Sequence, residues 1–147
     1  MASVLWVDDD ADSFPLVEKT IADLGARVHP CFTIASALEW IRKNRIPSCM
    51  LLDAIVPLGD PDLQAGLGDE FAHYTGRIIL REYPDLQKKT VVLSIVRSEI
   101  IRKVFHALGI ADQEPDNCRV FSKLELSGEK LKRFRNTMKS LLGQESI

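Results

Sequence analysis

Short apolar segments alternate along the chain with longer stretches in which apolar residues recur at helical spacing. The segments that read as strands cover residues 4–7, 27–31, 49–52, 90–93 and 118–121. The spacing of apolar residues predicts helices over residues 14–24, 34–41, 78–80, 101–108 and 131–141. Strands that are apolar on both sides are typical of a parallel sheet covered by helices on each face. The pattern therefore predicts a doubly wound α/β fold with a five-stranded parallel sheet.

The residues at the ends of the helical stretches support this interpretation. Thr33 and Ser127 are candidate N-caps of the second and the last helix. Gly25 and Gly109 follow the last apolar position of the first and fourth helices, where glycine commonly ends a helix. The third helix is expected to stop before Pro84, because the residue before a proline disfavours helical backbone.

Residues 58–75 do not follow the alternation. They carry glycines, prolines and acidic residues, namely Gly59, Asp60, Pro61, Asp62, Gly66, Gly68, Asp69 and Glu70. This composition predicts a long acidic loop, whose later half is also compatible with a helix. A chain of 147 residues that is 46% hydrophobic can build one core. We therefore predict a single domain over residues 1–147, with a loop insertion at about 58–75.

Charge and cysteine content narrow the range of functions. The 19 basic and 21 acidic residues give a net charge of -2, which does not indicate a nucleic-acid surface. The basic residues of the last helix are interpreted as its solvated face. Cys31, Cys49 and Cys118 are odd in number and lie in apolar surroundings, so reduced thiols and a cytoplasmic location are expected. No stretch is apolar and long enough to span a membrane, and no secretory leader is recognised.

Carboxylates follow two of the predicted strands. Asp8, Asp9 and Asp10 come directly after the first strand, and Asp53 comes directly after the third. The carboxyl ends of parallel strands meet at one edge of the sheet, where α/β proteins build their sites. Clustered carboxylate oxygens at that edge predict a bound cation, because hard divalent ions prefer oxygen ligands.

The polar residues at the strand ends also carry a resemblance to a known family. Pro57 stands four residues after Asp53, Ser94 follows the fourth strand and Lys123 follows the fifth. In this order the residues resemble the receiver domain of two-component response regulators, over nearly the whole chain. The resemblance implies the flavodoxin-like receiver fold. It also implies that Asp53 accepts a phosphoryl group from a histidine kinase or phosphotransfer protein, and that the chain signals to an output protein. From charge and hydropathy we expect no direct binding to nucleic acid or membrane.

The resemblance implies a Mg²⁺ site as well. Its ligands would be Asp9 and Asp53, Asp8 through water, and the backbone carbonyl of Ile55. The hydroxyl of Ser94 and the ammonium of Lys123 would bind phosphoryl oxygens. The chemistry requires such a cation, because a carboxylate and a phosphoryl group are both anionic and the developing charge must be neutralised.

Three positions depart from the receiver pattern. Receivers usually carry a small residue where this chain has Ile95, an aromatic switch residue where it has Val120, and a proline where it has Leu124. We expect Ile95 to restrict access to Asp53, and the altered switch at Val120 to shift the response to the loops around the site. The departures keep open a degenerate receiver, a protein-interaction module that is not phosphorylated.

Two further interpretations remain open. A salt bridge between Asp53 and Lys123 would account for a carboxylate at the end of an apolar strand without any catalysis. Alternatively, Asp8 and Asp10 are similar to the nucleophile and the acid/base of haloacid-dehalogenase phosphatases. That family has an acidic pair beyond the lysine, where this chain has only two separated glutamates, so this interpretation ranks below the receiver.

Overall fold

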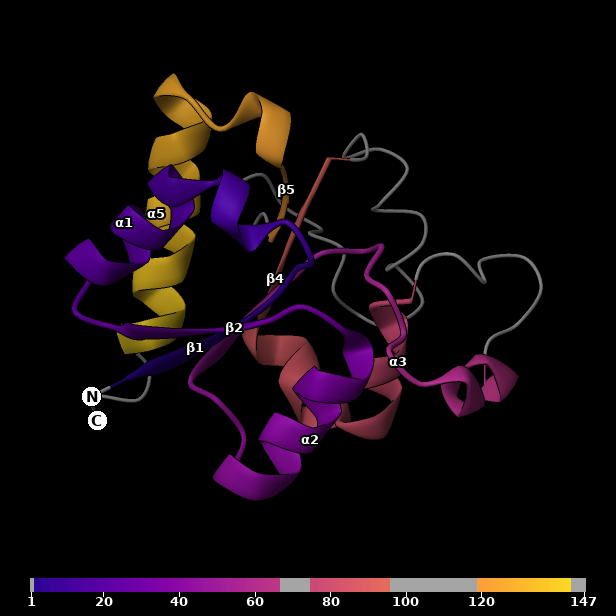
Figure 1. Cartoon of the computed structure of the whole chain (residues 1–147). Coiled ribbons are helices and arrows are strands. Elements are labelled where there is room, and N and C mark those ends of the chain that lie inside the picture. Colours follow the sequence, from indigo (N-terminus) through magenta and orange to yellow (C-terminus); the bar gives the residue numbers. More distant parts are fainter. Residues whose placement is uncertain (1, 67–74, 96–118, 144–147) are drawn as a thin grey trace.

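A computed structural model describes residues 2–66, 75–95 and 119–143 of the chain. Within these residues one sheet contains β1 (Ser3–Val7), β2 (Arg27–Cys31), β3 (Cys49–Leu52), β4 (Thr90–Ser94) and β5 (Val120–Ser122). The strand order is β2-β1-β3-β4-β5, and every neighbouring pair is parallel (Figure 1). The predicted five-stranded parallel sheet is confirmed, with β1 and β3 as direct neighbours.

Helices cover both faces of the sheet (Figure 1). One face carries α1 (Pro15–Asp23) and α5 (Gly128–Gly143), and the other carries α2 (Ile34–Asn44) and α3 (Arg77–Glu82). In β1, Leu5 belongs to the core under α2 and α3, whereas Trp6 belongs to the core under α1 and α5. Both side chains are buried, which explains why the strand is apolar on both sides. The predicted helix over 101–108, with Gly109 and Cys118, lies outside the described residues.

The helix ends agree with the predicted caps where the structure describes them. The Thr33 hydroxyl accepts the N–H of Ser36 at 3.0 Å, and the Ser36 hydroxyl accepts the N–H of Thr33 at 3.2 Å, which forms a capping box for α2. Gly25 after α1 has a φ of 81°, a left-handed conformation that favours glycine. Helix α5 begins directly after Ser127. Among the described residues, no helix is both long and apolar enough to cross a membrane.

Two short 3-10 helices differ from the predicted pattern. One spans Pro61–Gly66, so the expectation of a plain loop is wrong for these residues, and the other spans Pro84–Lys89. Both begin at a proline, whose fixed φ suits the first turn of a helix. The N–H of Asp62 also donates to Oδ1 of Asp60 at 3.0 Å. Such local bonds leave no signature in apolar spacing, and residues 67–74 lie outside the described part of the chain.

Strand β2 lies at one edge of the sheet and pairs only with β1 among the described strands. The N–H of Arg27 donates to the carbonyl of Ala2, and the carbonyl of Cys31 accepts the N–H of Asp8, both at 2.9 Å. Because peptide groups alternate in direction along a strand, Arg27 and Cys31 bond to β1 while Pro30 faces outward. Pro30 therefore costs no ladder bond, and it removes a donor from the exposed edge.

Candidate functional site

The acidic residues meet at the carboxyl ends of β1 and β3. The N–H of Asp8 bonds to Cys31 and the N–H of Asp53 bonds to Val7, both at 2.9 Å, so each acid is held by the continuing ladder. One carboxylate oxygen from each of Asp8, Asp9 and Asp53 lies within 4.8 Å of the others. Asp8 and Asp53 are buried, whereas Asp9 is exposed to solvent. Three carboxylates this close form a donor set suited to a hard divalent cation.

The ammonium of Lys123 bridges two of these carboxylates. Lys123 Nζ lies 2.9 Å from Oδ2 of Asp53 and forms a second ion pair with Oδ2 of Asp8. Only 1% of the lysine side chain is exposed. The ring of Phe14 lies under the ammonium, with its centroid 4.9 Å from Nζ, and adds a cation–π contact. The three carboxylates still outnumber the one ammonium, so the pocket stays acidic.

Burial and ion pairing shift the pKa values of Asp8 and Lys123. Burial raises the pKa of Asp8, and the hydrogen bond and charge of Lys123 oppose this rise without cancelling it. Burial alone would lower the pKa of Lys123, but its bonds to Asp8 and Asp53 outweigh burial, and the pKa of Lys123 is raised. The lysine is therefore firmly charged at neutral pH.

Backbone amides fix the other oxygens of the two buried acids. Oδ1 of Asp8 accepts the N–H of Asp10 at 2.9 Å, and Oδ1 of Asp53 accepts the N–H of Ile55 at 3.2 Å. Each carboxylate thus closes a local turn two residues long, which leaves its Oδ2 directed at Lys123. The role of the Ile55 carbonyl as a metal ligand stays a prediction.

Ser94 and Val120 lie on the neighbouring strands. Ser94 ends β4 and is 1% exposed, beside Ser122 of β5 in the register. Its position at the carboxyl edge suits the predicted phosphoryl contact. Val120 is 2% exposed and packs in the core under α2 and α3. Val120 carries no aromatic ring, so the altered switch at this position stays a prediction.

Two of the three positions that depart from the receiver pattern, Ile95 and Leu124, are exposed apolar residues. Ile95 directly follows Ser94 and is 57% exposed, and Leu124 directly follows Lys123 and is 75% exposed. Ile55, two residues after Asp53, is 40% exposed. Each of three residues assigned to the site, Ser94, Lys123 and Asp53, is thus followed within two positions by an exposed, branched apolar side chain.

Two contacts of the site were not found from the sequence. A Cβ on Gly76 would lie 2.6 Å from the carbonyl oxygen of Asp53, so only glycine fits there without a shift. Its N–H donates to the carbonyl of Ala54 at 3.1 Å, which ties the start of α3 to the end of β3. The contact between Phe14 and Lys123 was also missed. In the sequence Phe14 is only an apolar position of the first predicted helix, and nothing singles out Gly76.

Comparison with solved structures supports the fold. No protein-family model matches the sequence, and neither does any curated protein. Among solved structures, the chain is similar to the signal receiver domain of a Luxo repressor protein from Vibrio parahaemolyticus. That match has 14% identity and a TM-score of 0.63, and it covers 99% of this chain and 95% of the other.

Other receivers match to a similar degree. The non-phosphorylated HemR receiver domain from Leptospira biflexa has 20% identity and a TM-score of 0.60, over 97% of this chain and 94% of the other. A response regulator from Chloroflexus aurantiacus has 19% identity and a TM-score of 0.61, over 93% and 97%. The chain therefore has the fold of response-regulator receiver domains, with the flavodoxin-like strand order.

Proposed function

We propose that the chain is a response-regulator receiver that accepts a phosphoryl group on Asp53 in a Mg²⁺-dependent reaction. The observation that carries this proposal is the joint placement of a buried Asp53, two further carboxylates within 4.8 Å and the ammonium of Lys123. Phosphoryl transfer to a carboxylate needs a cation site and a fixed positive charge beside the nucleophile. The residues at the ends of β1, β3 and β5 offer both.

The donor set fits Mg²⁺. Asp8, Asp9 and Asp53 would hold the ion, with the carbonyl of Ile55 as a further ligand, because Mg²⁺ takes few carboxylates and keeps several waters. The bound ion would neutralise charge that develops on the transferred group. The exposed position of Asp9 leaves a route for the ion and its water to enter.

The protein groups account for the transfer itself. A carboxylate oxygen of Asp53 forms a bond to phosphorus while the bond from phosphorus to the imidazole nitrogen of a phosphohistidine breaks, and the imidazole leaves. The N–H of Ile55 on Oδ1 keeps the carboxylate oriented. Lys123 moves from its bridge between Asp8 and Asp53 onto a phosphoryl oxygen, and the hydroxyl of Ser94 binds another.

The partners follow from this chemistry. The phosphoryl donor would be a histidine kinase or a phosphotransfer protein. The signal would pass to a separate output protein. We also infer a cytoplasmic location, which the buried thiols of Cys31 and Cys49 support.

The decisive experiment is mass spectrometry after incubation with acetyl phosphate and Mg²⁺. One phosphoryl group on Asp53 is expected, which Asp53→Asn abolishes and Asp60→Asn, at an exposed acid outside the pocket, leaves in place. A label on Asp8 together with turnover of an aromatic phosphate would instead indicate a haloacid-dehalogenase-like phosphatase. No label on any residue would contradict the proposal.

A degenerate receiver is the second candidate. The bridge of Lys123 between Asp8 and Asp53 already compensates two buried carboxylates without a metal, and Val120 cannot act as an aromatic switch. In this case the fold would serve as a protein-interaction module, and neither Mg²⁺ nor beryllofluoride would bind at Asp53.

A further inference from the structure

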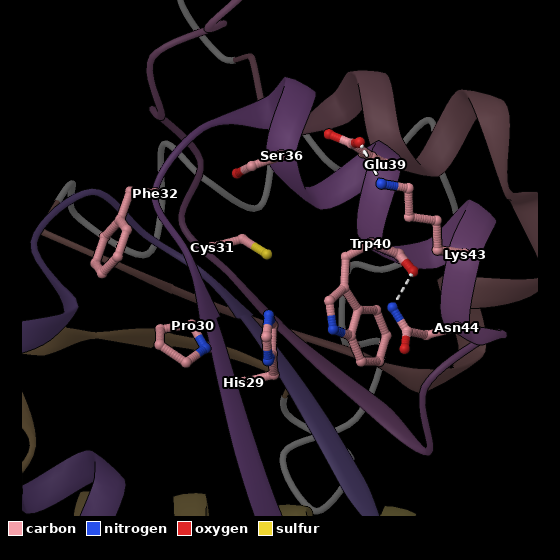
Figure 2. Close-up of a pocket in the computed structure, with 9 residues that line it drawn as sticks. All are labelled: His29, Pro30, Cys31, Phe32, Ser36, Glu39, Trp40, Lys43 and Asn44. Carbon is pink, nitrogen blue, oxygen red and sulfur yellow. Dashed lines mark hydrogen bonds and ion pairs between the residues drawn. The ribbon is translucent and has the colours of Figure 1, made fainter.

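A pocket separate from the acidic site lies between the edge strand β2 and helix α2 (Figure 2). Its volume is about 350 Å³. Residues of β2 and the turn after it, including His29, Cys31 and Phe32, line one part, and residues of α2, including Ser36 and Trp40, line the other. Pockets that bind small organic molecules in proteins begin at about this volume and combine aromatic walls with a few polar groups.

Ring faces and apolar side chains form the walls. The rings of His29 and Trp40 lie against each other, with centroids 5.2 Å apart and planes tilted by 30°. In Figure 2, strand β2 lies between Pro30 and Phe32 on one side and this pair on the other. Phe32 is 43% exposed. The pocket therefore offers aromatic surface on the α2 side of β2, which a flat ring can contact without ordering a flexible chain.

The charges in the pocket are paired with one another. Lys43 Nζ lies 2.7 Å from Oε1 of Glu39, and the side-chain amide of Asn44 donates to the carbonyl of Trp40 at 2.9 Å. The Cys31 thiol is buried, and burial raises its pKa, so it stays neutral. A charged ligand would gain little here, because the two charged side chains already pair with each other and both are more than half exposed.

We propose that this pocket binds an uncharged planar aromatic molecule. Its ring would lie on the α2 side of β2, against the rings of His29 and Trp40. Addition of a partner strand at the same edge is disfavoured, because Pro30 removes an outward donor from β2. The site does not use Asp53, so it does not depend on phosphorylation.

The test is a titration of the ¹⁵N-labelled full chain with indole, followed by NMR, with cyclohexanol as a non-aromatic control of similar apolar character. Shifts are expected at the indole N–H of Trp40 and at the amides of residues 29 and 31–32. The indole N–H of Trp6, which is buried on the opposite face of the sheet, should not move. Affinity in the millimolar range is expected for a ligand of this size.

Variants distinguish specific binding in the pocket from non-specific adsorption of indole to the protein surface. Trp40→Leu should weaken indole binding about threefold to tenfold, the worth of one aromatic contact, whereas Trp40→Phe should retain it. His29→Ala should also weaken indole binding. It tests the same pair of rings if Trp40→Leu does not fold. Arg42→Ala, on the exposed face of α2, is the matched control. Equal binding of cyclohexanol, shifts scattered over the surface, or unchanged binding in both wall variants would overturn the proposal.

Discussion

Lys123 Nζ lies 2.9 Å from Oδ2 of Asp53 and is also paired with Asp8, although only 1% of the lysine side chain and 7% of the Asp53 side chain are exposed. Three charged groups are thus buried together at the carboxyl edge of the sheet. Removing one partner of a buried ion pair leaves an uncompensated charge, which costs far more than breaking a pair at the surface. The lysine therefore has a structural role in addition to the proposed phosphoryl contact.

Lys123→Ala is expected to lower the free energy of unfolding by about 3–5 kcal/mol, because Asp8 and Asp53 would face each other without a cation. Urea denaturation in the presence of EDTA measures this loss. Adding Mg²⁺ should restore part of the stability, since the ion replaces the missing positive charge.

Lys130→Ala is the matched control for this prediction. Lys130 pairs with Glu125 on the surface, where both side chains are about half exposed, so its loss should cost less than about 1 kcal/mol. Equal small losses for Lys123→Ala and Lys130→Ala would show that the buried bridge is not important for stability.

The raised pKa of Asp8 gives a second prediction, in metal-free buffer. A carboxyl group whose pKa is raised by folding contributes stability below its unfolded pKa, near 3.8, and this contribution is lost as the pH rises through the folded pKa. Asp8→Asn removes the titration. At pH 7 the variant should be about 0.5–2 kcal/mol more stable than the wild type, and this advantage should shrink as the pH falls through the raised folded pKa of Asp8 toward 3.8. Thermal unfolding between pH 3 and pH 7 measures the difference, and an advantage independent of pH would contradict it.

The sequence was sufficient to predict the sheet and the acidic pair. Each strand is apolar on both faces, and strand ends in a parallel sheet converge, so the proximity of Asp8 and Asp53 follows from their positions alone. The bridge by Lys123 does not follow from the sequence, because spacing gives no side-chain direction. Contacts such as Phe14 under Lys123 depend on how the turn after β1 folds back, which apolar periodicity does not encode.

Gly76 illustrates a site requirement that is invisible in the sequence. Its φ of -55° is accessible to any residue, but a Cβ would lie 2.6 Å from the carbonyl oxygen of Asp53. Gly76→Ala should therefore cost about 1–3 kcal/mol through displacement of the end of β3, and it should weaken Mg²⁺ binding. Gly143→Ala, where nothing lies within 4 Å, should be neutral or slightly stabilising. Calorimetric unfolding and Mg²⁺ titration would compare the stability and Mg²⁺ affinity of the two variants. Equal effects of Gly76→Ala and Gly143→Ala would contradict the steric role of Gly76.

Ile95 provides a kinetic prediction. It directly follows Ser94, occupies a position where receivers usually have a small residue, and is 57% exposed. Ile95→Ala should accelerate labelling of Asp53 by acetyl phosphate severalfold without changing Mg²⁺ affinity, because the change opens access and leaves the metal ligands in place. Leu124→Ala serves as the comparison for loss of an exposed apolar residue. Equal labelling rates for wild type and Ile95→Ala would show that Ile95 does not restrict access to Asp53.

The pocket between β2 and α2 shares a hydrogen bond with the acidic site, because the carbonyl of Cys31 accepts the N–H of Asp8 at 2.9 Å. A ring bound against Cys31 would reduce the motion of this segment, and a second ligand then has less ordering to complete. Saturating indole should therefore tighten Mg²⁺ binding about fivefold, and Mg²⁺ should tighten indole binding by the same factor, since coupling between two sites is reciprocal. Isothermal titration of each ligand in the presence of the other measures both factors, and Trp40→Leu should abolish the effect of indole on Mg²⁺ binding.

If indole binds at Trp40 and the Mg²⁺ affinity does not change, the two sites are independent. If indole binds but Mg²⁺ does not bind at all, the result contradicts the acidic site and leaves the pocket proposal intact.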